Sequence, residues 1–328
     1  MKKGFRLLAL LLCAALLLPG AAACADAPVY HFDADFSQES FGDAVSRYLA
    51  SKYLNSYSVK IGWCDLQSGE EWYLGGDAFM ECASTYKLPL AMIYVDKIGY
   101  YVLGDALKAM LVDSSNPAGY ALRNNLSGDV MEYRRLQAAY SGLSEDEISP
   151  AFYNYNLFSP RFMIGTLHTL YDNSERYSLI LDYLKQARPT QYFSLYRGET
   201  EVAHKYGSYE DYVCDSGIIY TERPFLLCVM TYKVRGAPFI IGQIARIAMD
   251  YAEYLAAHPE PTPAPSSAPT PVPSPVPSPV PLPEPTPAPT PVPAPTVGSN
   301  KSLPGAAVTT GAVLNALPFI LRRGKKRS

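Results

Sequence analysis

The sequence is poor in histidine, with four residues in a chain of 328, and this scarcity excludes a histidine-rich metal centre. Its six cysteines form no Cys-x-x-Cys pair, which argues against a zinc site. Charged residues make up 18% of the chain and the formal net charge is −3, so no basic patch points to a nucleic-acid partner. Between the two ends no apolar run reaches about 18 residues, which excludes a polytopic membrane protein. With 48% hydrophobic residues the chain is still too apolar to be disordered.

Residues 1–25 have the composition of a signal peptide. A basic start precedes the apolar stretch Leu7–Leu18, which is short for a bilayer span and ends at Pro19-Gly20. Small residues then suit cleavage, with an uncleaved anchor as the alternative. Ala22-Ala23-Cys24 also loosely resembles a lipoprotein cleavage site. We therefore expect an exported protein.

The chain after residue 257 has no folding pattern. Residues 258–297 hold 18 of the 29 prolines and predict a semi-rigid polyproline II stalk on the order of 100 Å long. In residues 303–328, Leu303-Pro304-Gly305 precedes the apolar stretch Ala306–Leu321 and a basic tail. This layout resembles a Gram-positive cell-wall sorting signal, except that alanines replace the usual Thr and Gly. We expect attachment to the extracellular face of the cell membrane or wall, a disordered tail being the alternative.

Periodic patterns between residues 40 and 257 predict a single domain. Ser40–Leu54 predicts an amphipathic helix, Val59–Cys64 and Glu71–Leu74 a hairpin, and Thr85–Lys185 a block of helices. The inward face of the first helix is expected to carry Phe41, Val45, Leu49 and Tyr53. Further strands and a last helix are predicted at Glu201–Ser208, Tyr212–Tyr220, Phe225–Lys233 and Ile241–Ala256. Strands from both ends of the domain must meet in one sheet with helices covering it.

Four cysteines lie within this domain. An exported location permits disulfides, and four cysteines allow three sets of pairings. The sequence does not choose between the pairings of Cys64, Cys82, Cys214 and Cys228.

The segment Ser84-Thr85-Tyr86-Lys87, at the start of a predicted helix, is the first candidate for chemistry. A serine there places its hydroxyl near unpaired N–H groups and the positive end of the helix dipole. Lys87 lies on the same face one turn later, close enough to take the serine proton. The helix that follows is apolar nearly all round, and burial lowers a lysine pKa toward a value that suits a base. Alone, the pair is equally compatible with a serine cap and a surface lysine.

Two further pieces follow in order along the chain. Ser114-Ser115-Asn116 comes after a helical pattern, and Lys205-Tyr206-Gly207-Ser208 lies in a predicted strand. Together the three pieces resemble the Ser-x-x-Lys, Ser-x-Asn and Lys-Thr-Gly motifs of active-site-serine penicillin-recognising enzymes, most of all the class A β-lactamases. The resemblance covers about residues 40–257. It implies a β-lactamase/transpeptidase-like α+β fold, with a five-stranded antiparallel sheet covered by helices plus a helical subdomain.

The resemblance also implies which residues are catalytic. Ser84 would be the nucleophile that becomes acylated, and Lys87 its general base or proton relay. Ser114 would pass a proton to the leaving nitrogen, although its sequence context also suits a helix cap. The backbone N–H groups of Ser84 and Ser208 would form the oxyanion hole.

Substrate binding is implied for Asn116, Lys205, Gly207 and Ser208. Asn116 would hold the side-chain amide of the substrate, and Lys205 its carboxylate. Tyr206 replaces the small hydroxyl residue of the family motif, and we expect this change either to crowd the carboxylate contact or to remove it. Ser115 replaces an aspartate at a position that is mainly structural.

The glutamate that serves the family in deacylation has no match at its usual spacing before Ser159-Pro160. Glu145 or Glu147 could act from a rearranged loop, and solvated loop carboxylates are the alternative. We therefore expect slow deacylation.

These observations predict an exported serine hydrolase, without metal or other cofactor, that forms an acyl-enzyme with β-lactams or D-Ala-D-Ala-like peptides of peptidoglycan. A true class A β-lactamase and a catalytically weak penicillin or peptidoglycan sensor are the alternatives.

Overall fold

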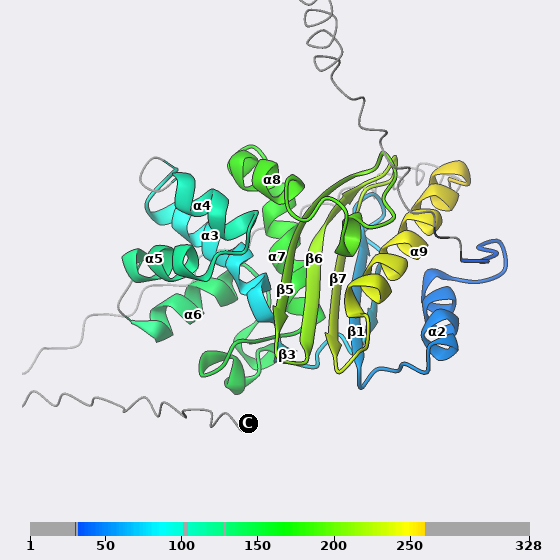
Figure 1. Ribbon diagram of the computed structural model, residues 1–328, viewed down its shortest axis with the longest axis horizontal. Coiled ribbons are helices and arrows are strands. Elements are labelled where there is room, and N and C mark those ends of the chain that lie inside the picture. Colours follow the sequence, from blue (N-terminus) through cyan, green and yellow to red (C-terminus); the bar gives the residue numbers. More distant parts are fainter. Residues whose placement is uncertain (1–29, 31, 101–103, 127–128, 260–328) are drawn as a thin grey trace, which may run out of the picture. The chain divides into compact units, whose positions relative to one another are not determined.

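The computed structural model describes residues 30, 32–100, 104–126 and 129–259 (Figure 1). The predicted signal peptide, nearly all of the predicted stalk and the C-terminal apolar segment lie outside these ranges. Within them, no helix combines the length and the apolarity that crossing a membrane requires.

A five-stranded antiparallel sheet forms the centre of the domain. Its strands in spatial order are β2 (Glu71–Leu74), β1 (Val59–Asp65), β7 (Phe225–Tyr232), β6 (Tyr212–Tyr220) and β5 (Glu201–Tyr209). The pairing of β1 with β7 joins the N-terminal hairpin to the three C-terminal strands. The predicted α+β fold with its antiparallel sheet is confirmed, and each of the five strand patterns found in the sequence overlaps a strand of this sheet.

Two helices from opposite ends of the domain cover one face of the sheet (Figure 1). The first, α2 (Phe41–Ser51), begins with a capping box: the Asp43 N–H donates to Ser40 Oγ, and the Ser40 N–H donates to the Asp43 carboxylate. The second, α9 (Ala237–Ala257), packs on β6 and β7 and starts four residues earlier than predicted. Their apolar faces and the sheet share one hydrophobic core.

Tyr53 does not join that core, contrary to the sequence prediction. The helix ends at Ser51, and Tyr53 adopts a left-handed backbone with φ of 56°. Its side chain is 97% exposed. Helical spacing places residues on one face only while the helix lasts, so the early end of α2 turns Tyr53 away.

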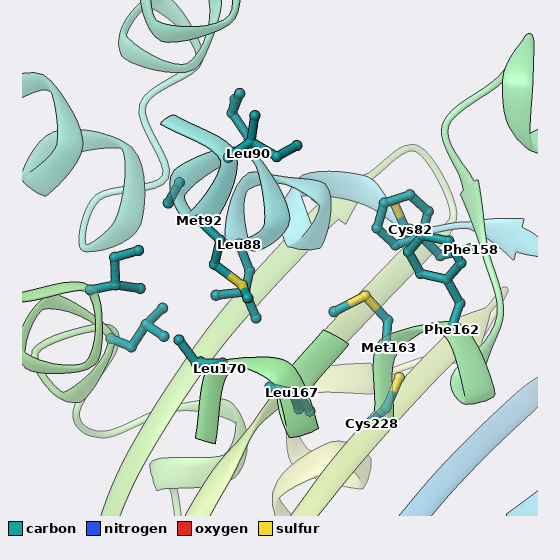
Figure 2. Packing of buried hydrophobic residues seen from close by; sticks show 14 of the residues in the cluster. Cys82, Leu88, Leu90, Met92, Phe158, Phe162, Met163, Leu167, Leu170 and Cys228 are labelled. Atoms are coloured by element: carbon teal, nitrogen blue, oxygen red, sulfur yellow. The ribbon is translucent and has the colours of Figure 1, made fainter. Parts of the chain in front are cut away.

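The opposite face of the sheet carries α7 (Pro160–Asp172), which packs on β1, β6 and β7. Against it lies α3 (Lys87–Lys97), the central helix of the helical subdomain, which is buried from Lys87 to Val95. Figure 2 shows leucine, methionine and phenylalanine side chains of α3, α7 and β4 gathered in a second core. A helix that is apolar all round must be enclosed, and this burial also encloses the lysine at its first position.

Other helices surround α3 or join it to the sheet. They are α4 (Gly104–Leu111), α5 (Asn116–Leu126), α6 (Val130–Ala139) and α8 (Ser178–Lys185). Short 3₁₀ turns are η1 (Ala83–Tyr86), η2 (Glu145–Glu147), η3 (Pro150–Tyr153) and η4 (Tyr192–Ser194). The first turn, η1, contacts β5 and β6 and leads directly into α3.

A second, two-stranded sheet was missed by the sequence prediction. β3 (Met80–Glu81) pairs antiparallel with β4 (Leu157–Phe158), and the Cys82 N–H donates to the carbonyl of Asn156 at 3.0 Å. Strands of two residues carry too little periodicity to be recognised in a sequence. The pairing ties the segment before Ser84 to the loop before α7.

Candidate active site

A cleft of about 360 Å³ opens beside Ser84. Ala83 and Ser84 of η1 line it, together with Asn116 at the start of α5 and Ser208 near the end of β5. The helical subdomain therefore supplies one wall and the edge strand of the sheet the other. Three predicted site residues, Ser84, Asn116 and Ser208, come together here from positions far apart in the sequence.

Ser84 lies in the 3₁₀ turn rather than at the cap of an α-helix. The residue before it, Ala83, has φ of 50°, a left-handed conformation that an alanine rarely adopts. Such a conformation costs about 1–3 kcal/mol and persists only where the surroundings hold it. Ser84 is half-buried at the edge of the cleft, so its hydroxyl is reachable from solvent.

Gly207 lets β5 run directly against the backbone of Ser84. A β-carbon at position 207 would lie 2.4 Å from the Ser84 nitrogen and 3.0 Å from the Ala83 β-carbon. Both contacts are too close for any residue but glycine. The close approach brings the next residue of the strand, Ser208, to the cleft beside Ser84.

The Lys87 side chain is fully buried behind the cleft. Its Nζ donates to the Ser114 carbonyl at 2.6 Å and to Asn116 Oδ1 at 2.7 Å, and lies 3.4 Å from Ser114 Oγ. Desolvation by burial lowers the pKa of Lys87 to about 8. Within the described chain no hydrogen bond joins Lys87 Nζ to Ser84 Oγ, so the amine faces the second motif.

Ser114 lies between two lysines. Lys205 Nζ donates to Ser114 Oγ at 3.0 Å and to the Tyr206 carbonyl at 2.7 Å. Burial, and after it the charge of Lys87, hold the pKa of Lys205 well below its usual range. Ser114 itself has φ of 57°, so the backbone bends sharply to bring this hydroxyl between the two amines. The chain Lys205–Ser114–Lys87–Asn116 gives protons a continuous hydrogen-bonded path.

Tyr206 does not crowd the cleft, contrary to the sequence prediction. Its side chain is buried, and its hydroxyl donates to the Val112 carbonyl at 3.3 Å. The ring lies against Tyr192, and Lys205 Nζ sits 4.0 Å from its centroid. Tyr206 therefore stabilises the buried ammonium through its π-face and leaves the cleft open.

Glu81 and Asn156 line the same cleft, and sequence reasoning missed both. Asn156 Nδ2 donates to Glu81 Oε1 at 2.6 Å and to the Ala83 carbonyl at 2.9 Å. The Ala83 N–H also donates to Glu81 Oε1, at 3.0 Å. Burial raises the pKa of Glu81 against the effect of these hydrogen bonds. A glutamate three residues before the candidate nucleophile was the one available sequence signal.

Two arginines of the helical subdomain and several tyrosines complete the lining of the cleft. Arg123 of α5 and Arg134 of α6 both line the cleft. Arg134 Nη1 donates to Gln137 Oε1 at 2.9 Å, and its guanidinium lies over the Phe152 ring. The tyrosines at this cleft are Tyr86, Tyr120, Tyr133 and Tyr209. Positive charge at this wall suits a substrate that carries a carboxylate.

Residues 96–252 match the model of the β-lactamase enzyme family. This segment contains Ser114, Asn116 and Lys205, and it begins after Ser84 and Lys87. The domain is β-lactamase-like. The resemblance predicted from the three motifs is thereby confirmed.

Solved structures agree on the β-lactamase-like fold. The β-lactamase from Chitinophaga pinensis superposes with a TM-score of 0.55 at 18% identity, covering 65% of this chain and 100% of that one. The β-lactamase from Sphaerobacter thermophilus gives 0.53 at 19% identity, with 67% and 99% covered. PBP-A gives 0.52 at 19% identity, with 64% and 96% covered. No curated protein sequence matches the chain.

Glu145 and Glu147 lie outside the cleft of the β-lactamase-like domain. Both side chains are exposed on η2 and neither lines the space beside Ser84. Glu147 accepts from the Ser144 N–H at 2.9 Å and from Ser144 Oγ at 2.6 Å. These hydrogen bonds lower the pKa of Glu147, as expected for a solvated capping carboxylate.

A buried Ser-His-Asp arrangement also exists in the β-lactamase-like domain. His204 Nδ1 lies 2.7 Å from Asp215 Oδ2, and His204 Nε2 lies 3.3 Å from Ser194 Oγ and 2.8 Å from the Ala187 carbonyl. All three side chains are buried, and none lines the cleft. The arrangement joins β5, β6 and η4, and a substrate has no access to Ser194 because its side chain is buried.

The four cysteines of the domain, Cys64, Cys82, Cys214 and Cys228, are free and buried. Cys64, Glu71 and His168 form one group of potential metal ligands among the described residues, with ligand atoms within 4.8 Å of one another. Cys64 Sγ lies 3.2 Å from His168 Nε2, while Glu71 accepts from Tyr73 and pairs with Arg161. These contacts account for each polar group without a metal.

Proposed function

We propose that the protein is a serine hydrolase that forms an acyl-enzyme at Ser84 with β-lactams or with D-Ala-D-Ala-like peptides of peptidoglycan. The observation that carries the proposal is the hydrogen-bonded chain from Lys205 through Ser114 to Lys87, next to a serine in a strained turn. A PBP-A variant of the same fold has been captured as an acyl-enzyme complex with penicillin G. Fold and site together support acyl transfer by a lysine-assisted serine.

Acylation would begin when Ser84 Oγ attacks the carbonyl carbon of the substrate amide. Lys87, whose pKa of about 8 leaves part of it neutral near pH 7, takes the hydroxyl proton. The N–H groups of Ser84 and Ser208 face the developing oxyanion, since Gly207 holds the two backbones together. The proton then passes through Ser114 to the leaving nitrogen, and the C–N bond breaks.

Substrate charge and shape would be read by the groups at the two ends of the cleft. Ser208 lines the cleft and suits the carboxylate found in both penicillins and D-Ala-D-Ala peptides, while Lys205, which is fully buried, would hold Ser114 in place. Asn116, which lines the cleft and whose oxygen accepts from Lys87, suits the side-chain amide. No metal or other cofactor takes part in these steps.

Covalent labelling tests the proposal. A fluorescent penicillin should label the wild-type domain, and Ser84→Ala should abolish the label, because Ser84 lines the cleft in the turn that leads directly into Lys87. Ser194→Ala is the matched control: it removes the serine of the buried Ser-His-Asp arrangement and should keep full labelling. Labelling of Ser84→Ala, or its loss in a folded Ser194→Ala protein, would contradict the assignment.

Export and attachment to the outer face of the cell envelope are part of the proposal and rest on the sequence of the two ends. A peptidoglycan substrate is found outside the cytoplasm, so the predicted signal peptide and the proposed function agree. The sequence also predicts slow deacylation, on the ground that Glu145 and Glu147 would not reach the ester. Glu81 lines the cleft and offers a different carboxylate for deacylation. The rate of deacylation distinguishes a hydrolase from a sensor.

A further inference from the structure

Glu81 is fixed beside the nucleophile by contacts that leave half of its carboxylate available. Both of its hydrogen bonds, from Asn156 Nδ2 and from the Ala83 N–H, end on Oε1. Among the described residues no group donates to Oε2. Glu81 lines the cleft beside Ser84, and a carboxylate held by one oxygen with the other free to accept a proton is suited to act as a general base.

The anchoring ties Glu81 to the turn that carries Ser84. Asn156 bridges the Glu81 carboxylate and the Ala83 carbonyl, so one amide group positions both. The β3–β4 pairing also holds the backbones of Glu81 and Asn156 together, since Glu81 pairs with Leu157, the neighbour of Asn156. The carboxylate therefore cannot move without the turn that precedes the nucleophile.

We propose that Glu81, positioned by Asn156, is the general base that activates the water for hydrolysis of the Ser84 acyl-enzyme. This inference rests on the proposed function. It places the base on the strand before the nucleophile, and not on the loop that contains Glu145 and Glu147.

The step balances as an ordinary ester hydrolysis. Glu81 Oε2 takes one proton from the water while the water oxygen bonds to the carbonyl carbon of the ester. The tetrahedral intermediate collapses, the bond from carbon to Ser84 Oγ breaks, and the proton on Glu81 passes to that oxygen. The product leaves as a carboxylic acid, and serine and glutamate return to their starting states.

Other groups at the cleft are less suited to this step. Lys87 Nζ already donates to the Ser114 carbonyl and to Asn116 Oδ1, and Lys87 does not line the cleft. Glu145 and Glu147 are exposed outside the cleft. The charged groups that act on Glu81 are Arg134, which lowers its pKa, and Glu210, which raises it; burial is the largest cause and raises it. A pKa above the usual glutamate range brings the base closer to the pH at which it works.

Time-resolved mass spectrometry of the penicillin adduct tests the inference. Glu81→Gln preserves size and can accept both hydrogen bonds through its amide oxygen, yet its nitrogen cannot take a proton. We expect acylation to change less than threefold and the adduct to persist about 100-fold longer or more, in the range typical of losing a general base. Glu145→Gln is the matched control and should clear the adduct at the wild-type rate.

Asn156→Ala tests the positioning role. Loss of a hydrogen bond that favours the carboxylate raises the Glu81 pKa further, so the acid limb of the deacylation rate should shift to higher pH. A variant that merely loosens the fold would slow deacylation at every pH without moving this limb.

The outcomes distinguish the role of Glu81 from the acylation of Ser84. Equal clearance by a folded Glu81→Gln protein and the wild type would overturn the role of Glu81 and leave Ser84 acylation intact. Absence of any adduct in both proteins would overturn the proposed function and this inference with it. If Glu81→Gln does not fold, the wild type still decides: its deacylation rate must fall as pH drops through one ionisation, and a pH-independent rate contradicts the inference.

Discussion

Lys87 and Lys205 are two buried amines that share one hydroxyl, Ser114 Oγ. Burial disfavours the charged form of each, and their mutual repulsion adds to this for Lys205. The Ser114 and Tyr206 carbonyls and the Tyr206 ring offset part of the desolvation. Such a pair can hold a proton on one amine while the other stays neutral.

The rate of acylation should therefore rise with pH around a midpoint near 8. Lys87 acts as a base only when neutral; because burial lowers its pKa to about 8, the neutral fraction is small at pH 6 and large at pH 9. Stopped-flow measurement of penicillin acylation over this range gives the profile. A rate that is flat or falls over the same interval would contradict the role of Lys87.

Removal of the Lys87 amine should slow acylation strongly. We expect Lys87→Ala to lower the acylation rate on the order of 1000-fold, the loss typical of an activating base. Lys97→Ala removes an exposed lysine at the other end of α3, where it pairs with Glu132, and should leave the rate nearly unchanged. Similar rates for the two variants would show that Lys87 is structural.

At the scale of the element, the site depends on how closely β5 passes η1. Ser84 and Ser208 can act on one oxyanion only if their backbones lie side by side, and Gly207 permits this. The left-handed φ of Ala83 belongs to the same close contact, because Ala83 is the first residue of η1, the turn that packs on the strand. Strand and turn therefore form the site together.

Gly207→Ala should separate the two backbones. The added methyl meets the Ser84 nitrogen at 2.4 Å, so β5 must shift and the oxyanion donors must part. We expect acylation to slow about 100-fold or more, as when an oxyanion donor is lost, with a modest fall in melting temperature. Ser208→Ala, which keeps its N–H, should lose less than tenfold. Wild-type acylation by Gly207→Ala would refute the close approach.

Local patterns were enough to predict the five strands of the central sheet and the main helices, because apolar periodicity marks these elements. The contact of Lys87 with Ser114 and Asn116 joins segments far apart in the sequence, so no local pattern predicts it. Glu81 and Asn156 could not be paired in this way. Their contact depends on a two-residue β-bridge between segments 75 residues apart, which leaves no periodic signal. The prediction that the Tyr206 ring crowds the cleft was wrong for a related reason, since the direction of this side chain depends on tertiary packing.

At the scale of the whole molecule, the β-lactamase-like domain is about two thirds of the chain, and the sequence of the two ends predicts where the protein is located. A stalk on the order of 100 Å would let a tethered domain reach peptide substrates in the surrounding wall. The C-terminal stretch Ala306–Leu321 is proposed to retain the protein at the envelope.

Truncation after Thr296 should release the protein into the medium. The variant keeps the domain and the stalk and loses the apolar stretch with its basic tail. Cell fractionation with an antibody to the domain measures the outcome, and Cys24→Ala is the comparison that tests lipid attachment instead. A truncated protein that stays with the membrane fraction would contradict C-terminal retention.

The central claim, acyl transfer by Ser84, is tested most directly by locating the adduct. The wild-type protein is mixed with excess penicillin, quenched in acid within seconds and digested, and the peptides are sequenced by mass spectrometry. We predict one added penicillin, attached to Ser84 in the peptide that also contains Lys87. An adduct on Ser194 or on any other residue, or no adduct at all, would contradict it.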